Sequence, residues 1–286
     1  MSGASDPQWF VETLYNDYQQ RLKITKVLHR ETTEFQDLLI FENPRFGRVM
    51  ALDGIVQTTE RDEFCYHEML AHVPILAHGA ARRVAIVGGG DGGALEEVLK
   101  HPVESVTMVE LDDTVMKISR EFLPGICRDA FEDQRLELHF MDGTRFVKET
   151  ARKFDVIIVD STDPVGPGAV LFSAEFYADC AACLGEAGIL VTQSGVTFMQ
   201  NEEAAGTYRR MNSLFPDTGL YITQVPSYGA GYMTFGWGCH SPAPRRTAAS
   251  DIARRFAALD LELHYYSPRV HVASFALPTY IEALKS

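Results

Sequence analysis

Three aspartates stand at points of the sequence where carboxylates could surround a cation. Asp160 and Asp163 follow a run of apolar residues, and Asp91 lies within a run of glycines that follows another apolar run. Neither segment contains a Lys or Arg. Because several carboxylates share one cleft most favourably around a positive charge, this pattern indicates a site for a cationic compound. The alternative is a cluster of turn and helix-capping residues, since Asp is also an ordinary turn residue.

The glycine run at residues 88–93 fits the pattern G-x-G-x-x-G and lies between a predicted strand and a predicted helix. Glycines let the backbone approach a nucleotide closely, and Glu110 at the end of the next strand could accept both ribose hydroxyls. Asp91 would repel the phosphates of a dinucleotide, so the motif favours an adenosyl sulfonium compound over NAD. Asp142 and Gly143 end the third strand, where they could contact adenine or form only a turn.

Metal binding fits these residues less well. The three aspartates do not have the spacing of an EF-hand loop and would come from separate strands. His67 and His72 are five residues apart, which puts them on different helix faces and excludes the H-E-x-x-H zinc geometry. We therefore expect no metal. Taken alone, His67 would be an ordinary helix residue, and Tyr66 and Tyr228 would be aromatic residues of the core or its rim.

Hydrophobic periodicity predicts the elements that must position these residues. Residues 22–59 alternate short β-like runs with turn signals such as Asp53-Gly54, which predicts a small antiparallel unit. Helical spacing over residues 60–77 predicts a helix. Beyond residue 82, strands and helices alternate, which is typical of a parallel sheet with helices on both faces. The predicted strands are residues 82–90, 105–112, 135–143, 154–161 and 188–195.

Two late strands, residues 219–226 and 231–240, are predicted to close this sheet. The loop between them is too short for a parallel crossover, so they must pair as an antiparallel hairpin. A parallel sheet that ends in such a hairpin indicates the methyltransferase-type variant of the Rossmann fold. The predicted class is therefore α/β: a small N-terminal antiparallel β domain, followed by a Rossmann-like, mostly parallel sheet with a terminal antiparallel hairpin.

Composition narrows the range of partners. The 286 residues carry a formal charge of −13 and no Lys/Arg cluster, which argues against a nucleic-acid-binding protein. The sequence has no long apolar run and no signal peptide at its start, so we expect a cytoplasmic protein without membrane partners. The five cysteines are odd in number and scattered, which favours reduced thiols. Cys180 and Cys183 lie within a helical pattern, where we expect them to be buried.

Several segments together resemble those of the polyamine aminopropyltransferases, above all those of the spermidine synthases. They are residues 41–74, 87–99, 108–112, 141–143, 159–172, 226–237 and 275–280. The resemblance implies a β-strand domain at residues 1–60, which takes part in oligomerisation and forms an edge of the substrate site. It also implies a Rossmann-like catalytic domain at residues 61–286 and assembly as a homodimer or homotetramer.

The resemblance also implies roles for individual residues. Asp160 matches the catalytic base of the family. Residues implied to bind the donor are Gln36, Asp91, Glu110, Asp142, Gly143 and Pro167. Residues implied to bind the acceptor are Tyr66, His67, Asp91, Asp160, Asp163 and Tyr228.

The implied reaction transfers an aminopropyl group from decarboxylated S-adenosylmethionine to putrescine, giving spermidine and 5′-methylthioadenosine. No metal or redox cofactor is expected, because the sulfonium is itself a good leaving group. Alternatives are a diamine N-methyltransferase that uses S-adenosylmethionine, and an aminopropyltransferase for cadaverine, agmatine or spermidine. A non-catalytic polyamine or nucleoside sensor and an NAD oxidoreductase are further alternatives. The aspartates at 91, 160 and 163 argue against the methyltransferase and the sensor, and Asp91 argues against NAD.

Overall fold

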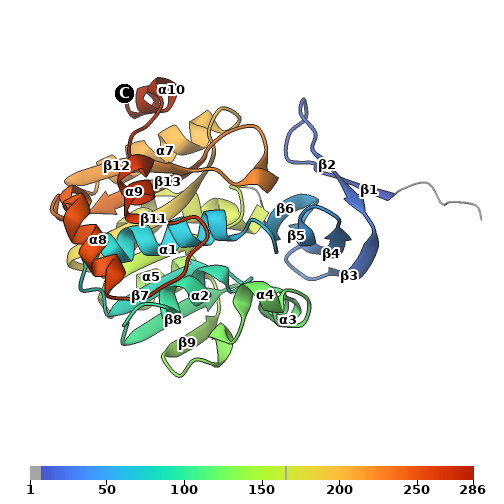
Figure 1. Cartoon of the computed structure of the whole chain (residues 1–286), viewed down its shortest axis with the longest axis horizontal. Coiled ribbons are helices and arrows are strands. Elements are labelled where there is room, and N and C mark those ends of the chain that lie inside the picture. Colours follow the sequence, from blue (N-terminus) through green and yellow to red (C-terminus); the bar gives the residue numbers. More distant parts are fainter. Residues whose placement is uncertain (1–7, 165) are drawn as a thin grey trace, which may run out of the picture.

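The N-terminal part of the chain forms two small antiparallel sheets (Figure 1). The computed structural model describes residues 8–164 and 166–286, apart from the side chain of Pro167. The strands are β1 (Gln8–Val11) and β2 (Arg21–Ile24) in one sheet, and β3 (Lys26–Thr32), β4 (Asp37–Asn43), β5 (Gly47–Leu52) and β6 (Ile55–Thr59) in the other. Asp53 and Gly54 have φ of 50° and 78°, as the predicted tight hairpin requires. Phe10 stacks on Phe41, so the two sheets share one core.

The second part of the chain is built on a seven-stranded sheet in the order β12-β13-β11-β10-β7-β8-β9. Its strands are β7 (Arg83–Gly88), β8 (Ser105–Glu110), β9 (Leu136–Phe140), β10 (Phe154–Asp160), β11 (Leu184–Val196), β12 (Asp217–Thr223) and β13 (Met233–Cys239). Strands β7 to β11 are parallel, whereas β13 pairs antiparallel with both β11 and β12. The predicted fold class and the predicted terminal hairpin are therefore confirmed.

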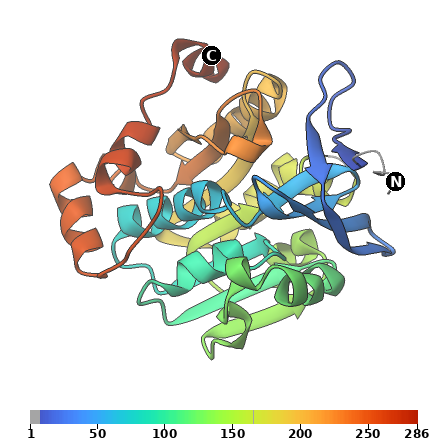
Figure 2. The same ribbon diagram turned by 45° about the vertical axis from the view of Figure 1, so that its right-hand side comes forward.

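Helices cover both faces of this sheet (Figure 2). One face packs against α1 (Phe64–His78), α2 (Gly93–Leu99), α8 (Ala249–Ala257) and α9 (Pro268–Ser274), and the other against α5 (Gly143–Glu149), α6 (Ala174–Cys183) and α7 (Asn201–Asn212). The remaining helices are α3 (Asp113–Phe122), α4 (Pro124–Cys127) and α10 (Thr279–Glu282), with short 3₁₀ turns η1 (Ala130–Glu132), η2 (Gly166–Phe172), η3 (Pro226–Tyr228), η4 (Pro244–Arg246) and η5 (Ala283–Lys285).

The four-stranded N-terminal sheet packs directly on the second part of the chain. Leu38 and Met50 from the N-terminal sheet form one apolar cluster with Val115 and Ile118 from α3. Burial of such side chains contributes about 1.5 to 3 kcal/mol each, so this contact holds the sheet over the end of β8. The chain passes from β6 to α1 between residues 59 and 64, and we keep the domain division after residue 60 as a proposal.

Two buried histidines join α1 to α2. His72 Nδ1 lies 2.7 Å from His101 Nε2, and His72 Nε2 lies 2.8 Å from Glu97 Oε2. Because a carboxylate only accepts, His72 donates to Glu97 from Nε2 and accepts from His101 at Nδ1. Burial lowers the pKa of His72 to about 3 and that of His101 well below its usual range. Both imidazoles are therefore neutral in the folded protein.

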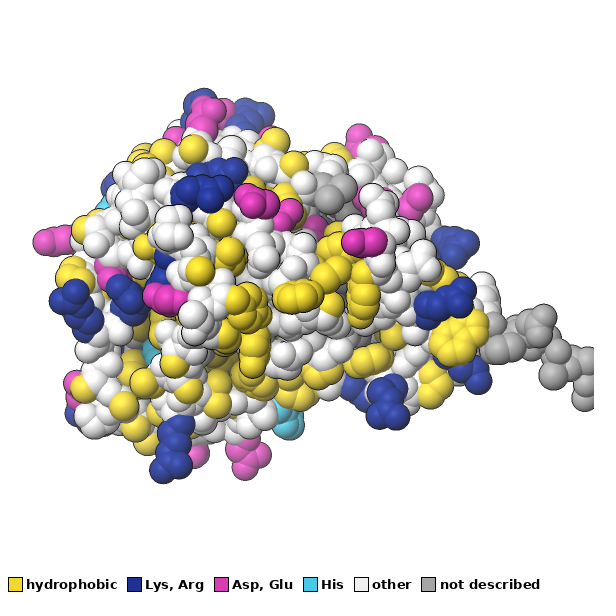
Figure 3. Space-filling model, turned by 90° about the horizontal axis from the view of Figure 1, so that it is seen from above, with side chains coloured by type: hydrophobic (Ala, Val, Ile, Leu, Met, Phe, Trp, Pro, Cys, Tyr) yellow, Lys and Arg dark blue, Asp and Glu magenta, His cyan; other side chains and the backbone are white. Residues whose placement is uncertain are grey.

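The distribution of charged side chains and the state of the cysteines match what the composition predicts. On the face drawn in Figure 3, basic side chains lie singly or in small groups among acidic ones. All five cysteines are buried and unpaired, as expected for Cys180 and Cys183 in α6. Among the described residues, no helix has the length and apolar character needed to cross a membrane. The cytoplasmic location stays a prediction.

Candidate active site

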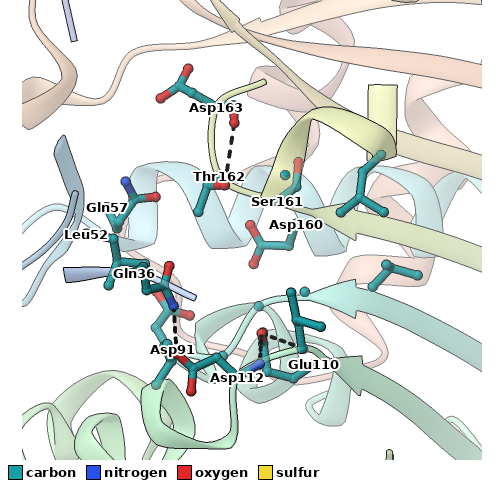
Figure 4. Close-up of a pocket in the computed structure, with 18 of the residues that line it drawn as sticks. Gln36, Leu52, Gln57, Asp91, Glu110, Asp112, Asp160, Ser161, Thr162 and Asp163 are labelled. Atoms are coloured by element: carbon teal, nitrogen blue, oxygen red, sulfur yellow. Dashed lines mark hydrogen bonds between the residues drawn. The ribbon is translucent and has the colours of Figure 1, made fainter. Parts of the chain in front are cut away.

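A cavity opens at the carboxyl edge of the parallel strands, between this edge and the N-terminal sheet. Its walls come from the loops after β7, β8 and β10, from the first turn of α1, and from β5, β6 and the loop before β4. Predicted site residues that line it are Gln36, Tyr66, His67, Asp91, Glu110, Gly143, Asp160, Asp163 and Tyr228. The close-up in Figure 4 shows Asp160 to Asp163 on one wall and Asp91, Glu110 and Asp112 on the opposite one.

Two predicted residues stand apart from this set. Asp142 is exposed and does not line the cavity, although its neighbour Gly143 does. Its carboxylate caps α5 by accepting from the backbone N–H of Thr144 at 2.8 Å. Pro167 lies on η2, and its side chain is outside the described part of the structure. Their roles toward the donor stay predictions.

The glycines after β7 bring the backbone of this loop against the end of β10. Gly88 has φ of +84°, and its neighbour Gly89 donates its N–H to the carbonyl oxygen of Asp160 at 2.9 Å. A Cβ at position 88 would lie only 2.2 Å from this same carbonyl oxygen. The loop therefore needs glycine at position 88. The close contact between the two backbones fixes the position of Asp160 at the edge of the sheet.

We expect Gly88→Ala to lower kcat about 100-fold or more, because a displacement of about 1 Å at a reacting group has effects of this size. The variant should also unfold at a lower temperature, since alanine is strained at this φ. Turnover and thermal unfolding would be measured beside Gly125→Ala, where an added Cβ meets no atom within 4 Å. Equal turnover of the two variants would contradict a positioning role for this loop.

Glu110 and Gln36 lie at the end of the cavity where the sequence predicts the nucleoside, which we call the nucleoside end. Glu110 Oε1 accepts the backbone N–H groups of Leu111 and Asp112 at 2.8 and 3.2 Å. Burial raises the pKa of Glu110 to about 7. Gln36 donates its side-chain amide to Asp112 at 3.1 Å, across the boundary between the two parts of the chain. A carboxylate at the end of the second strand is suited to paired ribose hydroxyls.

Asp160 is surrounded by aromatic rings at the other end of the cavity. The Tyr66 hydroxyl donates to Asp160 Oδ1 at 2.8 Å. Tyr228 packs edge-on against Tyr66 with ring centroids 6.1 Å apart, and its hydroxyl donates to the carbonyl of Gln57 at 2.6 Å. Burial, followed by the nearby charge of Asp91, raises the pKa of Asp160 to about 6, although His67 and Tyr66 oppose this rise. Asp160 can thus exchange a proton near neutral pH.

His67 is held between two carboxylates. Its Nδ1 lies 2.7 Å from Glu63 Oε2, and its Nε2 lies 3.4 Å from Asp91 Oδ2. Burial disfavours the charged imidazole, but the charges of Asp91 and Glu63 outweigh it, so the pKa of His67 lies well above its usual range. Burial alone would raise the pKa of Asp91, but His67 outweighs that effect and the net shift is downward. His67 thus pairs with two carboxylates and lines the cavity, and its role toward a substrate stays a prediction.

The cluster of His67, Asp91 and Asp160 offers three potential ligand atoms within 4.8 Å of one another. However, both ring nitrogens of His67 already face carboxylates at 2.7 and 3.4 Å. A metal needs a free lone pair on nitrogen, which this arrangement does not provide. The cluster is better suited to ion pairing with an organic cation.

A side pocket continues from Asp163 toward the β1–β2 hairpin, and apart from Tyr66, Asp163 and Tyr228 the sequence did not predict its residues. It is lined by Glu12, Leu14, Tyr15, Ile55, Val56, Gln57, Tyr66, Ser161, Asp163, Gln193, Gly195, Val196, Gln200, Tyr228 and Met233. Gln200 donates to Asp163 Oδ1, and Glu12 accepts the backbone N–H of Val56 at 3.0 Å. Burial raises the pKa of both carboxyl groups. Only the acidic character of Glu12 could have suggested it, because residues 8–21 show no clear periodicity.

Comparison with known proteins identifies the family of this chain. The sequence model of the spermine/spermidine synthase domain matches residues 63–246, and that of the spermidine synthase tetramerisation domain matches residues 8–60. The chain belongs to the spermidine synthase family of polyamine aminopropyltransferases. The match to the tetramerisation domain supports the predicted oligomerisation through the N-terminal part.

Individual members of the spermidine synthase family match over almost the whole chain. The polyamine aminopropyltransferase of Pseudomonas syringae pv. tomato is 55% identical over 95% of this chain and 96% of its own length. A spermidine synthase crystallised with the transition state analogue AdoDATO has a TM-score of 0.91 and 38% identity, over 98% of this chain and 96% of that one. The spermidine synthase of Thermotoga maritima has a TM-score of 0.88 and 36% identity, over 98% and 95%.

Proposed function

We propose that this aminopropyltransferase uses decarboxylated S-adenosylmethionine as donor and putrescine as acceptor, and that it releases spermidine and 5′-methylthioadenosine. The observation that supports this proposal is the negative charge of the cavity. Asp91, Asp160 and Asp163 line it, and among the described residues no Lys or Arg does. A cationic donor and a dicationic acceptor suit such walls. The structural relative with a bound transition state analogue supports this assignment.

The donor would lie along the carboxyl edge of the sheet. Glu110 would accept the ribose hydroxyls, and Gln36 would close the cavity from the N-terminal side. The sulfonium would then lie near the middle of the cavity, with its aminopropyl arm directed toward Asp91 and His67. Both parts of the chain contribute to this site, which agrees with their shared apolar contact at α3.

The chemistry needs one proton transfer and one displacement. The ammonium of the acceptor loses a proton to the Asp160 carboxylate, and the freed nitrogen lone pair attacks the methylene next to sulfur. The carbon–sulfur bond breaks, and its electron pair stays on sulfur, which gives the neutral thioether. Asp160 then passes the proton to solvent. We propose that no metal or redox cofactor takes part, because the positive sulfur is itself the leaving group.

Proton transfer to Asp160 is helped by its surroundings. A free carboxylate with a pKa near 4 is a weak base for an ammonium with a pKa near 10. The higher pKa of Asp160, about 6, narrows this gap. The acceptor nitrogen has no lone pair while it is an ammonium, so we propose that Asp160 takes this proton before the bond to carbon forms.

The side pocket would hold the distal ammonium of the acceptor. Asp163 and Glu12 supply two carboxylates there, and the aromatic rings of Tyr66 and Tyr228 flank the path from Asp160. Such a pocket suits a short diamine with one charge at each end. Putrescine is the proposed acceptor, while cadaverine, agmatine and spermidine are the competitors to compare.

A direct test incubates the protein with the decarboxylated donor and each amine, and analyses the products by mass. We expect putrescine to gain one aminopropyl unit. A gain of one methylene unit with S-adenosylmethionine as donor would instead identify a methyltransferase. No product with any amine would contradict an enzymatic role.

The side pocket gives a second expectation. Glu12→Gln should raise the KM for putrescine about tenfold, the equivalent of about 1.4 kcal/mol, and leave the KM for the donor unchanged. Glutamine keeps an oxygen for the Val56 N–H, so the fold should survive. Glu34→Gln, at an exposed position of the same N-terminal part, is the matched control. An unchanged KM for putrescine would exclude Glu12 from the acceptor site.

A further inference from the structure

The imidazole of His67 lies between two carboxylates. Glu63 Oε2 lies 2.7 Å from Nδ1 and Asp91 Oδ2 lies 3.4 Å from Nε2, and the His67 side chain is only 4% exposed. A carboxylate accepts hydrogen bonds but donates none, so Nδ1 presents its proton to Glu63, and the nearby charge of Asp91 favours a second proton on Nε2. The two carboxylates therefore favour an imidazolium at this position.

Other groups around the ring strengthen this conclusion. Asp160, at the end of β10, has a carboxylate oxygen within 4.8 Å of a ring nitrogen of His67. From α1 itself, the Tyr66 ring packs edge-on at a centroid distance of 5.2 Å, and its hydroxyl is engaged by Asp160. Glu110, from β8, lines the same cavity. Among the described residues that line the cavity, every other charged side chain is thus acidic.

The position of this imidazolium creates a conflict with the proposed donor. The aminopropyl arm ends in an ammonium, which has three N–H donors and no lone pair. An imidazolium beside Asp91 has no lone pair either. Two cations would then compete for one carboxylate and would repel each other at short range.

We propose that His67 releases its Nε2 proton to solvent when the donor binds, and that the ammonium of the donor takes the place of the imidazolium beside Asp91. This inference rests on the proposed function. The freed Nε2 lone pair then accepts a hydrogen bond from the ammonium. Glu63 acts as the positioning residue, because it keeps the Nδ1 proton and so turns the lone pair toward the arm. Beside Asp91 one positive charge thus replaces another, and the sulfonium adds a further positive charge to the cavity.

Proton release makes donor binding depend on pH in a defined direction. Below the pKa of His67, the affinity for the donor should rise about tenfold per pH unit, because one proton leaves for each donor bound. 5′-Methylthioadenosine occupies the nucleoside end but carries no ammonium. The affinity for 5′-methylthioadenosine should therefore not change with the protonation of His67. Comparing the two ligands separates a proton released by His67 from one released by Glu110, whose pKa is about 7.

The test measures released protons by calorimetry, in mildly alkaline buffers that differ in ionisation enthalpy. For the unmodified protein we expect about one more proton released by decarboxylated S-adenosylmethionine than by 5′-methylthioadenosine. His67→Gln should abolish this difference and flatten the pH dependence of donor affinity. Glu63→Gln should reduce it, because the imidazolium loses one of its two carboxylates. His139→Gln, which removes a histidine paired with Glu137 outside the cavity, should behave as the unmodified protein.

Equal proton release by the two ligands would overturn the exchange, even if the donor binds and reacts normally. A difference that persists in His67→Gln would assign the proton to another group and would also overturn it. Failure of the proposed function has another signature, because the donor would then not bind or no aminopropyl product would form. The measurements on the unmodified protein need no variant to fold.

Discussion

Asp160→Asn is expected to lower kcat by roughly 1000-fold, within the range that a positioned acid or base contributes. Asparagine has nearly the same shape and can still accept from the Tyr66 hydroxyl, which lies 2.8 Å from Asp160 Oδ1. It has no basic oxygen to take a proton from the acceptor ammonium. The loss should therefore appear in single-turnover rates at saturating amine, while the affinity for 5′-methylthioadenosine changes little.

The matched control for this variant is Asp113→Asn, which removes a carboxylate that pairs with Lys117 on the surface. It should react at the normal rate. Near-normal turnover of Asp160→Asn would assign the proton to another group. A parallel loss of nucleoside affinity would show instead that the substitution distorts the cavity.

Asp91 is expected to select the donor. S-adenosylmethionine carries a carboxylate near the atom where the decarboxylated donor has only hydrogen, and Asp91 would repel it. At about 5 Å and an effective dielectric constant of about 20, two like charges repel by about 3 kcal/mol, which corresponds to a preference of roughly 100-fold. Asp91→Asn should reduce this preference to less than about tenfold.

Calorimetry with both nucleosides in one mildly alkaline buffer would measure this preference. 5′-Methylthioadenosine serves as the control ligand, because it lacks both the ammonium and the carboxylate. Its affinity should be similar with and without the substitution. Equal affinities of the unmodified protein for the two donors would refute electrostatic selection by Asp91.

Much of the fold and of the central site follows from local sequence patterns. Runs such as residues 154–160 are apolar and end in polar residues, so they predict buried parallel strands whose ends meet at one edge. The proximity of Asp91 and Asp160 can therefore be predicted from the sheet topology, without any knowledge of side-chain contacts. The hairpin of β12 and β13 was predictable because its short connection excludes a parallel crossover.

The rest depends on packing between segments that are distant in sequence. Glu12 belongs to the site only because the β1–β2 hairpin lies beside the loop that carries Asp163. No periodicity in residues 8–21 indicates this approach. The pairing of Glu63 with His67 has the i,i+4 spacing of a helix pair. The sequence does not show that Asp91 lies on the opposite side of the ring, where it favours the protonated imidazole together with Glu63. Asp142 had two sequence interpretations, and the structure shows a helix cap.

The neutral histidines between α1 and α2 make the folded state less stable in acid, independently of catalysis. Unfolded histidine titrates near 6.5, whereas burial holds the pKa of His72 at about 3. A lowered folded pKa means that the unfolded chain binds more protons. This contribution to stability is thus complete above about pH 6.5 and declines as the medium becomes more acidic, by about 2 kcal/mol for His72 at pH 5, and His101 shifts stability in the same direction. Acid inactivation should accordingly have two time courses: protonation of Asp160 is immediate and reversed at once by neutralisation, whereas unfolding around His72 and His101 accumulates during incubation.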